Sequence, residues 1–487
     1  MMKESLFSYV VLTVTLSMVA ADVQGEKRWL AGDHHVHSQF SVGWDDSVTP
    51  PKPVPGGDAV NPIPDNASLG RKYGLSWMVT TDHGGPSHSK VNRDLAYPEL
   101  LVSRKQVPEV VQFYGMELNT PAADHSSLII PYTPDEREVL FELEKGFDKR
   151  EAFPFDLTRD TEEKMLEALE AMRNLPEPPV VIANHPSRSA LEYGKYGLHS
   201  PMEFRKWNNL APNVAIGMAG APGHQAGTLA NFKISEKGKQ SNRKNPAKDK
   251  RYEVPRGAYG GYPTSGGFDQ MTAKIGGFWD SMLGEGRHWW ITANSDFHRH
   301  YSIDGIDFYP GEYSKTYVYA EKNHDSILAA LRSGKVFVTT GDLVSEVNVR
   351  VSLDDQAATM GSTLSVPKGA KVHVEITVRD PAGANASQDT PAVNRVDLIA
   401  GDVNPKSEDL RTNSNPSTAV SYRFSKNEWQ RDGEVLTMTH RIKVKQSMYL
   451  RIRGTNTSEL EPERDGTDES PWDDLWFYTN PVFIAVQ

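Results

Sequence analysis

The feature that most constrains this chain is a series of short apolar segments that lie next to histidine and acidic residues. The segments cover residues 75–81, 110–116, 127–131, 179–183, 214–218 and 289–293. Helical spacing of apolar residues is clearest over residues 161–172, where Asp160 or Thr161 can cap the helix and Pro176 closes it. Short strands that alternate with helices predict an α/β fold with a parallel sheet. In parallel barrels, polar residues at the carboxyl ends of the strands are the usual place for chemistry.

Histidine and acidic residues recur at these strand ends in a pattern that indicates a metal site. The series begins with residues 32–38, GDHHVHS. Because alternate side chains of a strand share a face, His35 and His37 project together and His34 points away. Twelve of the fifteen histidines lie between positions 34 and 300, which concentrates them in the α/β part. With the other strand ends, the candidate metal ligands are His35, His37, His83, Glu117, His125, His185, Asp296 and His298.

The composition restricts both the metal and the partners. The chain has no cysteine, which excludes disulfides, thiolate zinc sites and cysteine nucleophiles. Any metal must therefore be held by nitrogen and oxygen ligands, which suit divalent ions such as Zn, Mn or Fe. The formal net charge of -11 argues against nucleic acid as a general partner, because phosphate backbones bind to basic surfaces. A buried cationic cluster could still attract a single phosphate.

The N-terminus predicts export. Lys3 precedes an apolar run from Leu6 to Ala20, and small and polar residues follow it. This pattern is typical of a signal peptide over residues 1–22 and is too short for a comfortable membrane span. We expect a periplasmic or secreted protein without a stable membrane span after cleavage. An uncleaved N-terminal anchor is the alternative.

The pattern changes near residue 345. Alternating apolar and polar residues cover residues 347–351, 371–378, 395–399, 436–444, 449–453 and 481–486. Period-2 alternation with Gly, Asn, Asp and Pro connections predicts a separate antiparallel β-sandwich over residues 345–487. We expect it to pack against or shield the α/β domain at residues 27–344, with carbohydrate binding as the alternative. A Lys/Arg-rich insertion at residues 233–256 fits either a surface loop or a lid near an anionic ligand.

The successive motifs resemble those of a known superfamily. GDHHVHS, TTDHG, GMEL, NHPS and NSDFH are similar, in this order over residues 29–342, to the motifs of the polymerase and histidinol phosphatase (PHP) superfamily. The resemblance implies a distorted (β/α)7 barrel whose strand ends hold two or three metal ions and hydrolyse a phosphoester, either a monoester or a diester. It also implies a first metal held by His35, His37, Glu117 and Asp296, a second held by Glu117, His125 and His185, and a third held by His83 and His298.

The first motif departs from the family pattern. The family usually places an acid or histidine shortly after this motif, but here Ser41 is followed by Val42 and Gly43. Asp45 or Asp46 could reach the third metal instead. A two-metal site is therefore the alternative to a three-metal site.

Such ligands imply hydrolysis by a metal-bound hydroxide, since dications held by neutral imidazoles acidify water. We expect direct attack by water on a small-molecule phosphoester, with Asp296 orienting the nucleophile. Arg188 and Arg299 are candidates to pair with phosphate oxygens, and His224 is a candidate to contact substrate. Asp33 and Asp82 adjoin ligands and are expected to orient them. The remaining histidines of this region are expected to be structural or exposed: His34, His88, His199, His288 and His324.

Two other functions fit the same residues. The first is hydrolysis of a carboxylic ester, lactone or amide by the same metal-bound hydroxide, because fold does not determine function. The second is a metal- or glycan-binding surface protein without catalytic activity. The sequence leaves open the substrate, the native metal and the oligomeric state.

Overall fold

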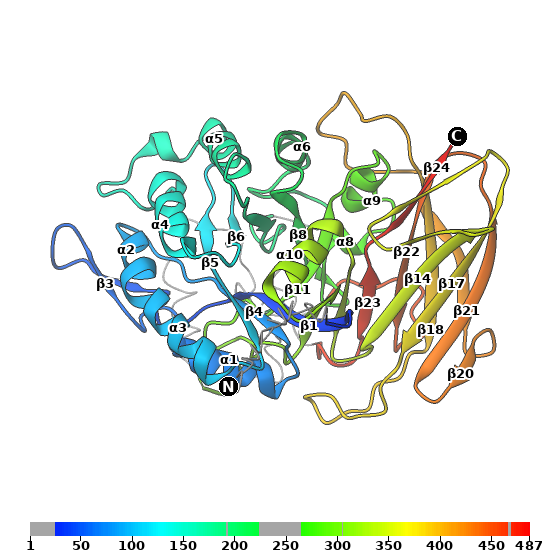
Figure 1. The fold of residues 1–487 in the computed structure, drawn as a ribbon, viewed down its shortest axis with the longest axis horizontal. Coiled ribbons are helices and arrows are strands. Elements are labelled where there is room, and N and C mark those ends of the chain that lie inside the picture. The colour runs from blue at the N-terminus through cyan, green and yellow to red at the C-terminus, as the bar shows by residue number, and fades with distance from the viewer. Residues whose placement is uncertain (1–24, 191–192, 224–263, 304, 466–468) are drawn as a thin grey trace, which may run out of the picture.

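The computed structural model describes residues 25–190, 193–223, 264–303, 305–465 and 469–487. The fold is mixed α/β, with strands and helices alternating along a large mixed sheet and a separate antiparallel sheet near the C-terminus (Figure 1). The predicted signal peptide, His224 and the insertion at residues 233–256 lie outside the described residues. Within those ranges, no helix combines the length and apolar character needed to cross a bilayer.

The N-terminal part of the large sheet carries the strand ends that the sequence singled out. Its strands, in spatial order, are β11 (Trp290–Asn294), β8 (Ala215–Pro222), β7 (Val180–Ala183), β6 (His125–Ile129), β5 (Val111–Asn119), β4 (Trp77–Thr80), β1 (Arg28–Val36), β12 (Ser314–Ala320) and β13 (Val336–Thr340). Adjacent pairs are parallel from β11 to β7 and from β5 to β1. In these parallel pairs, the carboxyl ends of the strands lie at the same end of the sheet.

Strand β6 runs antiparallel to both of its neighbours, β5 and β7, which differs from the parallel sheet that the strand and helix pattern predicts. Only residues 120–124 connect β5 to β6. A parallel crossover needs about a dozen residues or more, so this connection permits only a hairpin. Because β6 is reversed, its first residue His125 pairs with Asn119 at the end of β5. The reversal therefore places His125 near Glu117.

The sheet curls until its edge strand β11 returns to β1 and β12. The main-chain N–H of His37 donates to the Phe297 carbonyl at 2.9 Å, and Val36 and Phe297 form a parallel bridge. On the other side, the Ala293 N–H donates to Thr316 Oγ1 at 2.7 Å. The first and last motifs with candidate metal ligands thus become neighbours, although His37 and Asp296 are 259 residues apart in the chain.

Helices cover the outside of the curled sheet (Figure 1). They are α1 (Ile63–Lys72), α2 (His88–Val91), α3 (Tyr97–Gln106), α4 (Glu136–Phe147), α5 (Glu162–Arg173), α6 (Pro201–Leu210), α8 (Gln270–Ala273), α9 (Phe278–Leu283) and α10 (His324–Ser333). The cap predicted for α5 is confirmed, since Thr161 Oγ1 accepts a hydrogen bond from the Lys164 N–H at 3.2 Å. Helix α10 ends at Gly334, whose φ of 70° is the left-handed conformation expected of a terminating glycine.

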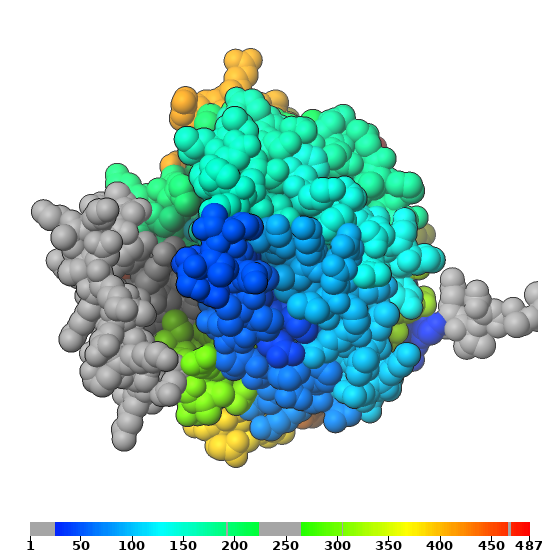
Figure 2. All heavy atoms as spheres, turned by 90° about the vertical axis from the view of Figure 1, so that its left-hand side faces the viewer, coloured from blue at the N-terminus to red at the C-terminus, as the bar shows by residue number. Residues whose placement is uncertain are grey.

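Two short hairpins complete the α/β part. They are formed by β2 (Gly43–Asp45) with β3 (Lys52–Val54), and by β9 (Thr264–Ser265) with β10 (Phe268–Asp269). Figure 2 shows the face from which the first hairpin, in dark blue, projects among the other N-terminal residues. The segment that follows this hairpin leads into α1.

The large sheet continues into the C-terminal region. Strand β13 pairs with β23 (Trp476–Thr479), and the sheet then contains β22 (Met448–Thr455), β18 (Arg395–Asp402), β19 (Ala419–Ser425), β24 (Val482–Val486) and β16 (Thr363–Val366). The side chain of Asn480 also hydrogen-bonds both main-chain groups of Ile291 in β11, at 2.9 and 3.3 Å. Residues near the end of the chain therefore contact the strand that leads to Asp296. The domain boundary at residues 344 and 345 stays a prediction.

A separate antiparallel sheet is formed by β15 (Gln356–Thr359), β14 (Glu346–Leu353), β17 (Lys371–Arg379), β21 (Val435–Lys443) and β20 (Gln430–Asp432). Strand β17 shows the predicted alternation, because Val372, Val374, Ile376 and Val378 are buried and the residues between them are not. These four side chains share one apolar cluster with Val396, Leu398, Leu450 and Ile452 of the large sheet. The two sheets thus pack together through their apolar faces.

Candidate metal centre

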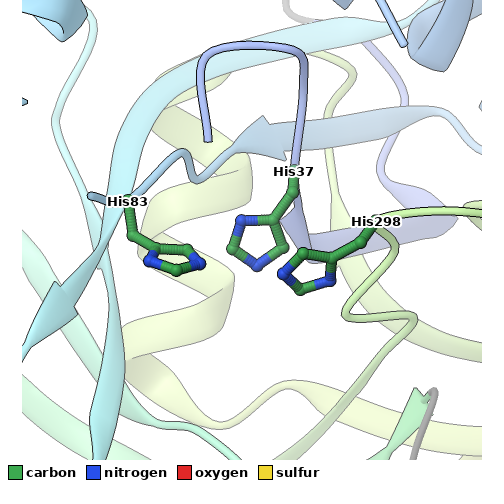
Figure 3. Close-up of side chains that lie close together, drawn as sticks. All are labelled: His37, His83 and His298. Carbon is green, nitrogen blue, oxygen red and sulfur yellow. The ribbon is translucent and has the colours of Figure 1, made fainter. Parts of the chain in front are cut away.

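The predicted ligands come together in three groups, although they come from six separate strand ends. In each group, one nitrogen or oxygen atom per residue lies within 4.8 Å of the others. The groups are His35, His37, Glu117 and Asp296; Glu117, His125 and His185; and His37, His83 and His298. Figure 3 shows the last group, whose three rings lie close together. All eight predicted ligands are buried or half-buried.

Glu117 in β5 belongs to two of these groups. Its Oε1 lies 3.1 Å from His35 Nε2, 3.1 Å from His125 Nδ1 and 3.2 Å from His185 Nε2. Its Oε2 lies 3.6 Å from His37 Nε2. A single buried carboxylate surrounded by four imidazoles is an arrangement that can bridge two cations.

The pair His35 and His37 provides a test of whether a cation fits. Their Nε2 atoms lie 2.9 Å apart, and both face Asp296 Oδ1, at 3.1 and 3.2 Å. A cation between the two nitrogens can bind the lone pairs of both, whereas without a cation His35 Nε2 must carry a proton to bond His37 Nε2 or Asp296 Oδ1. Since each is buried completely, water cannot separate them. The arrangement therefore fits a divalent cation with nitrogen and oxygen ligands.

Neighbouring polar groups orient these ligands as a metal site requires. His37 Nδ1 lies 2.8 Å from Ser41 Oγ, and this hydroxyl donates to Asp82 Oδ1 at 3.1 Å. Asp33 accepts hydrogen bonds from the main-chain N–H groups of His35 and Ser295, at 3.0 and 3.1 Å. The predicted supporting positions of Asp33 and Asp82 agree with these contacts. His34, which points away as expected, is held between the hydroxyls of Ser127 and Thr292 at 3.0 and 2.8 Å.

The main chain is strained at two of the ligands. His185 has a φ of 30° and Asp296 a φ of 49°, in a region that residues with a side chain rarely occupy. Such conformations cost about 1–3 kcal/mol and cluster at functional sites. Their occurrence at two residues that share one cluster supports a functional role for it.

The electrostatic environment differs between the imidazoles. At His35 and His298, burial lowers the pKa, but nearby carboxylates outweigh it and raise the pKa of both, that of His298 to about 9. Burial lowers the pKa of His185 to about 3, and the charge of Arg188 acts in the same direction. Burial also lowers the pKa of His37 and of His125. For Glu117, burial opposes ionisation, but the charges of His125 and His35 outweigh it and hold its pKa well below the usual value. Neutral imidazole and ionised carboxylate are the forms that bind metals.

The candidate arginines have different surroundings. The Arg188 guanidinium pairs with Asp124, and its Nη2 lies 3.3 Å from His125 Nδ1. It therefore borders the group that contains His125. Arg299 is half-buried, and its main-chain N–H donates to Asp307 Oδ2 at 2.9 Å. His224 lies outside the described residues, so its predicted contact with substrate stays a prediction.

Histidines that were expected to be structural or exposed have such surroundings. His88 lies 2.6 Å from Glu144 Oε1, His199 lies 3.2 Å from Glu203 Oε2, and His324 bonds the Gln112 carbonyl at 3.1 Å. His288 is exposed beside Trp290. These four residues take part in none of the three groups.

Sequence reasoning missed two polar residues at this site. Asn184 donates from Nδ2 to Glu117 Oε1 at 3.0 Å and accepts from Ser127 Oγ at 2.9 Å; its position just before His185 was the available signal. Asp58 lies beside His83, with its Oδ2 3.1 Å from His83 Nε2. It follows no apolar segment, so no strand-end pattern marked it. Asp45 and Asp46 were the acids considered for the third metal, but Asp45 accepts hydrogen bonds from Ser47 at 2.5 and 3.0 Å, and Asp46 is exposed.

Comparisons with known proteins identify no family for this chain. No family model matches the chain, and no curated protein matches it. Among solved structures, a chitin binding domain from Burkholderia pseudomallei is similar over 25% of this chain and 57% of that domain, at 9% sequence identity and a TM-score of 0.14. The chain thus spans little more than half of that domain, and a similarity this weak supports no argument about fold or function.

Proposed function

We propose that this chain is an exported metal-dependent phosphoesterase of the PHP type. The observation that carries the proposal is the Glu117 carboxylate, which belongs to two ligand groups: its Oε1 faces His35, His125 and His185, and its Oε2 faces His37. Two neighbouring cations can hold both the attacking and the leaving oxygens of an in-line displacement at phosphorus. The order of the motifs along the chain supports the PHP type.

The architecture supports the same proposal. The contact between Val36 and Phe297 brings the edge strand β11 back to β1, as closure of a distorted barrel requires. The shared apolar cluster of the two C-terminal sheets supports a β-sandwich beside this barrel. The proposed catalytic unit is the barrel, with the sandwich in a packing role.

The charge of the ligands favours a phosphoester over a neutral substrate. Among the residues of the first two groups, only Glu117 and Asp296 carry negative charge, and two dications would exceed them by two positive charges. An anionic phosphoester would compensate this excess, whereas a neutral carboxylic ester, lactone or amide would not. Arg188, which pairs with Asp124 and lies next to His125, has further donor groups that can bond a phosphate oxygen.

Bound cations would lower the pKa of water to about 7 and polarise the phosphoryl group. Asp296 is placed to orient the water, because its Oδ1 faces His35 and its Oδ2 lies 3.8 Å from His185 Nε2. Asn184 holds Glu117 Oε1 in position through its Nδ2. Water is the proposed nucleophile, without a phosphorylated protein residue.

A substrate panel with a matched pair of variants tests the proposal. The metal-loaded protein is assayed with an aryl phosphomonoester, an aryl phosphodiester and the corresponding carboxylic ester, with Zn, Mn or Fe. We expect hydrolysis of a phosphoester, a loss of about 100-fold or more in Asp296→Asn, and no change in Asp45→Asn. Hydrolysis of the carboxylic ester alone would contradict the proposal, as would equal activity in Asp296→Asn.

A further inference from the structure

His37 appears in two of the three groups but can bind only one cation. Its Nδ1 is bonded to the Ser41 hydroxyl, which leaves Nε2 as the ligand atom. Nε2 lies 2.9 Å from His35 Nε2 and 3.2 Å from Asp296 Oδ1. An imidazole nitrogen has one lone pair and cannot bridge two cations. With His37 in the first group, the third group retains only His83 and His298.

Asp58 supplies the carboxylate that His83 and His298 lack as a pair. Its Oδ2 lies 3.1 Å from His83 Nε2 and 3.6 Å from His298 Nε2. His298 Nδ1 lies 2.9 Å from the Asp296 main-chain carbonyl and donates to it, so a neutral His298 presents the lone pair of Nε2. The same carboxylate oxygen therefore faces the ligand nitrogens of both histidines.

The main chain holds Asp58 in this place. Just before it, the Gly56 N–H donates to the Gln39 carbonyl at 2.7 Å, and just after it the Ala59 N–H donates to the Ser41 carbonyl at 3.3 Å. Gly57 packs so closely on Gly43 that a Cβ at Gly57 would lie 2.5 Å from the Gly43 nitrogen. The segment after the β2–β3 hairpin is thus fixed on both sides of Asp58 to the residues that follow His37.

We infer that Asp58 is the carboxylate ligand of a third cation, held together with His83 and His298, and that this cation exchanges more readily than the other two. The inference rests on the proposed metal centre and adds a ligand that the motif pattern does not supply. The side chains of Asp58, His83 and His298 are 42%, 15% and 22% exposed, whereas that of Glu117 is 2% exposed. Solvent therefore reaches this site directly. It also has one carboxylate, whereas the two buried groups share Glu117 and Asp296.

Metal counting with two matched variants tests the inference without an activity assay. The whole protein is stripped with chelator, reloaded with Zn or Mn at graded concentrations, and analysed for metal per chain. Wild type and Asp45→Asn are expected to bind three cations, and Asp58→Asn two, with the third affinity weakened by about 100-fold or more. His83→Ala is expected to lose the same cation. The affinity for the first two cations is expected to stay within about threefold in all variants.

The outcomes separate this inference from the proposed function. Three cations bound by Asp58→Asn with wild-type affinity would overturn the assignment of Asp58. Wild type that never binds more than two would overturn the third site and leave a two-metal phosphoesterase intact. Absence of any bound metal would overturn both. Thermal unfolding of the metal-free proteins is the folding control, and a cooperative transition is expected for every variant.

Discussion

Replacing Glu117 with glutamine removes the charge that two cation sites share while keeping the shape of the side chain. Glu117 Oε1 faces His35, His125 and His185 at 3.1–3.2 Å. Its charge and that of Asp296 raise the pKa of His35 against the opposing effect of burial. Glu117→Gln is therefore expected to weaken both cation sites and to lower the pKa of His35.

The expected loss of cation affinity in Glu117→Gln can be estimated from the charges. A carboxylate and a dication about 4 Å apart attract by about 8 kcal/mol at an effective dielectric constant of ~20, twice the value for two unit charges. The amide oxygen of glutamine can still bind a cation and so retains part of this attraction. A net loss of about 3–4 kcal/mol per cation remains, which weakens each Kd by about 100- to 1,000-fold.

Competition with a chromogenic chelator measures both affinities, and NMR titration of the metal-free protein measures the pKa of His35. Glu144→Gln is the matched control, because Glu144 is an equally buried acid paired with a histidine, His88, outside the metal groups. Circular dichroism checks that both variants fold. Two cations bound by Glu117→Gln within threefold of the wild-type Kd would refute the bridging role of this carboxylate.

Two further predictions concern Arg188 and His88. Arg188→Ala is expected to lower kcat/KM for a phosphoester by about 10- to 100-fold, the effect of losing one charged hydrogen bond. Hydrolysis of a neutral ester should stay unchanged. An unchanged kcat/KM for the phosphoester would show that Arg188 does not bind substrate. For His88, burial lowers the pKa, but the charge of Glu144 outweighs it and raises the pKa to about 9. The folded state then binds a proton more tightly than the unfolded state, so this stabilisation is complete below pH 6.5 and is lost as the pH rises towards 9. In urea unfolding of the metal-free protein, the difference in unfolding free energy between wild type and His88→Gln should shrink by about 1.4 kcal/mol per pH unit between pH 6.5 and about 9. A difference that is constant with pH would contradict the ion pair between His88 and Glu144.

The sequence was most informative where ligands adjoin apolar strands. His35, Glu117, His185 and Asp296 each lie within a few residues of a buried strand, and the curled sheet brings these ends together. Periodicity could not reveal the direction of β6, because direction depends on the short connection at residues 120–124 and not on the pattern of the strand. It also could not reveal Asp58, which is positioned by loop hydrogen bonds to Gln39 and Ser41.

The pairing of strands that are distant in the chain also could not be predicted from the local sequence pattern. Strands β13 and β23 both show apolar residues typical of buried strands, but nothing in either sequence specifies the other as its partner. Strand pairing over long separations depends on which edges remain available after the rest of the chain has folded. By contrast, the alternation of apolar and polar residues over 371–378 and 436–444 is a local pattern, and it correctly predicted strands β17 and β21.

The hydrogen bonds from Asn480 to Ile291 set an order of events during biosynthesis. Strand β11, which leads to Asp296, lacks these two partners until Asn480, 189 residues further along the chain, has emerged. If the polypeptide crosses a membrane as an extended chain, the ligand cage is then completed only on the far side. The cations it acquires would therefore be drawn from the supply of the destination compartment and not from that of the cytosol.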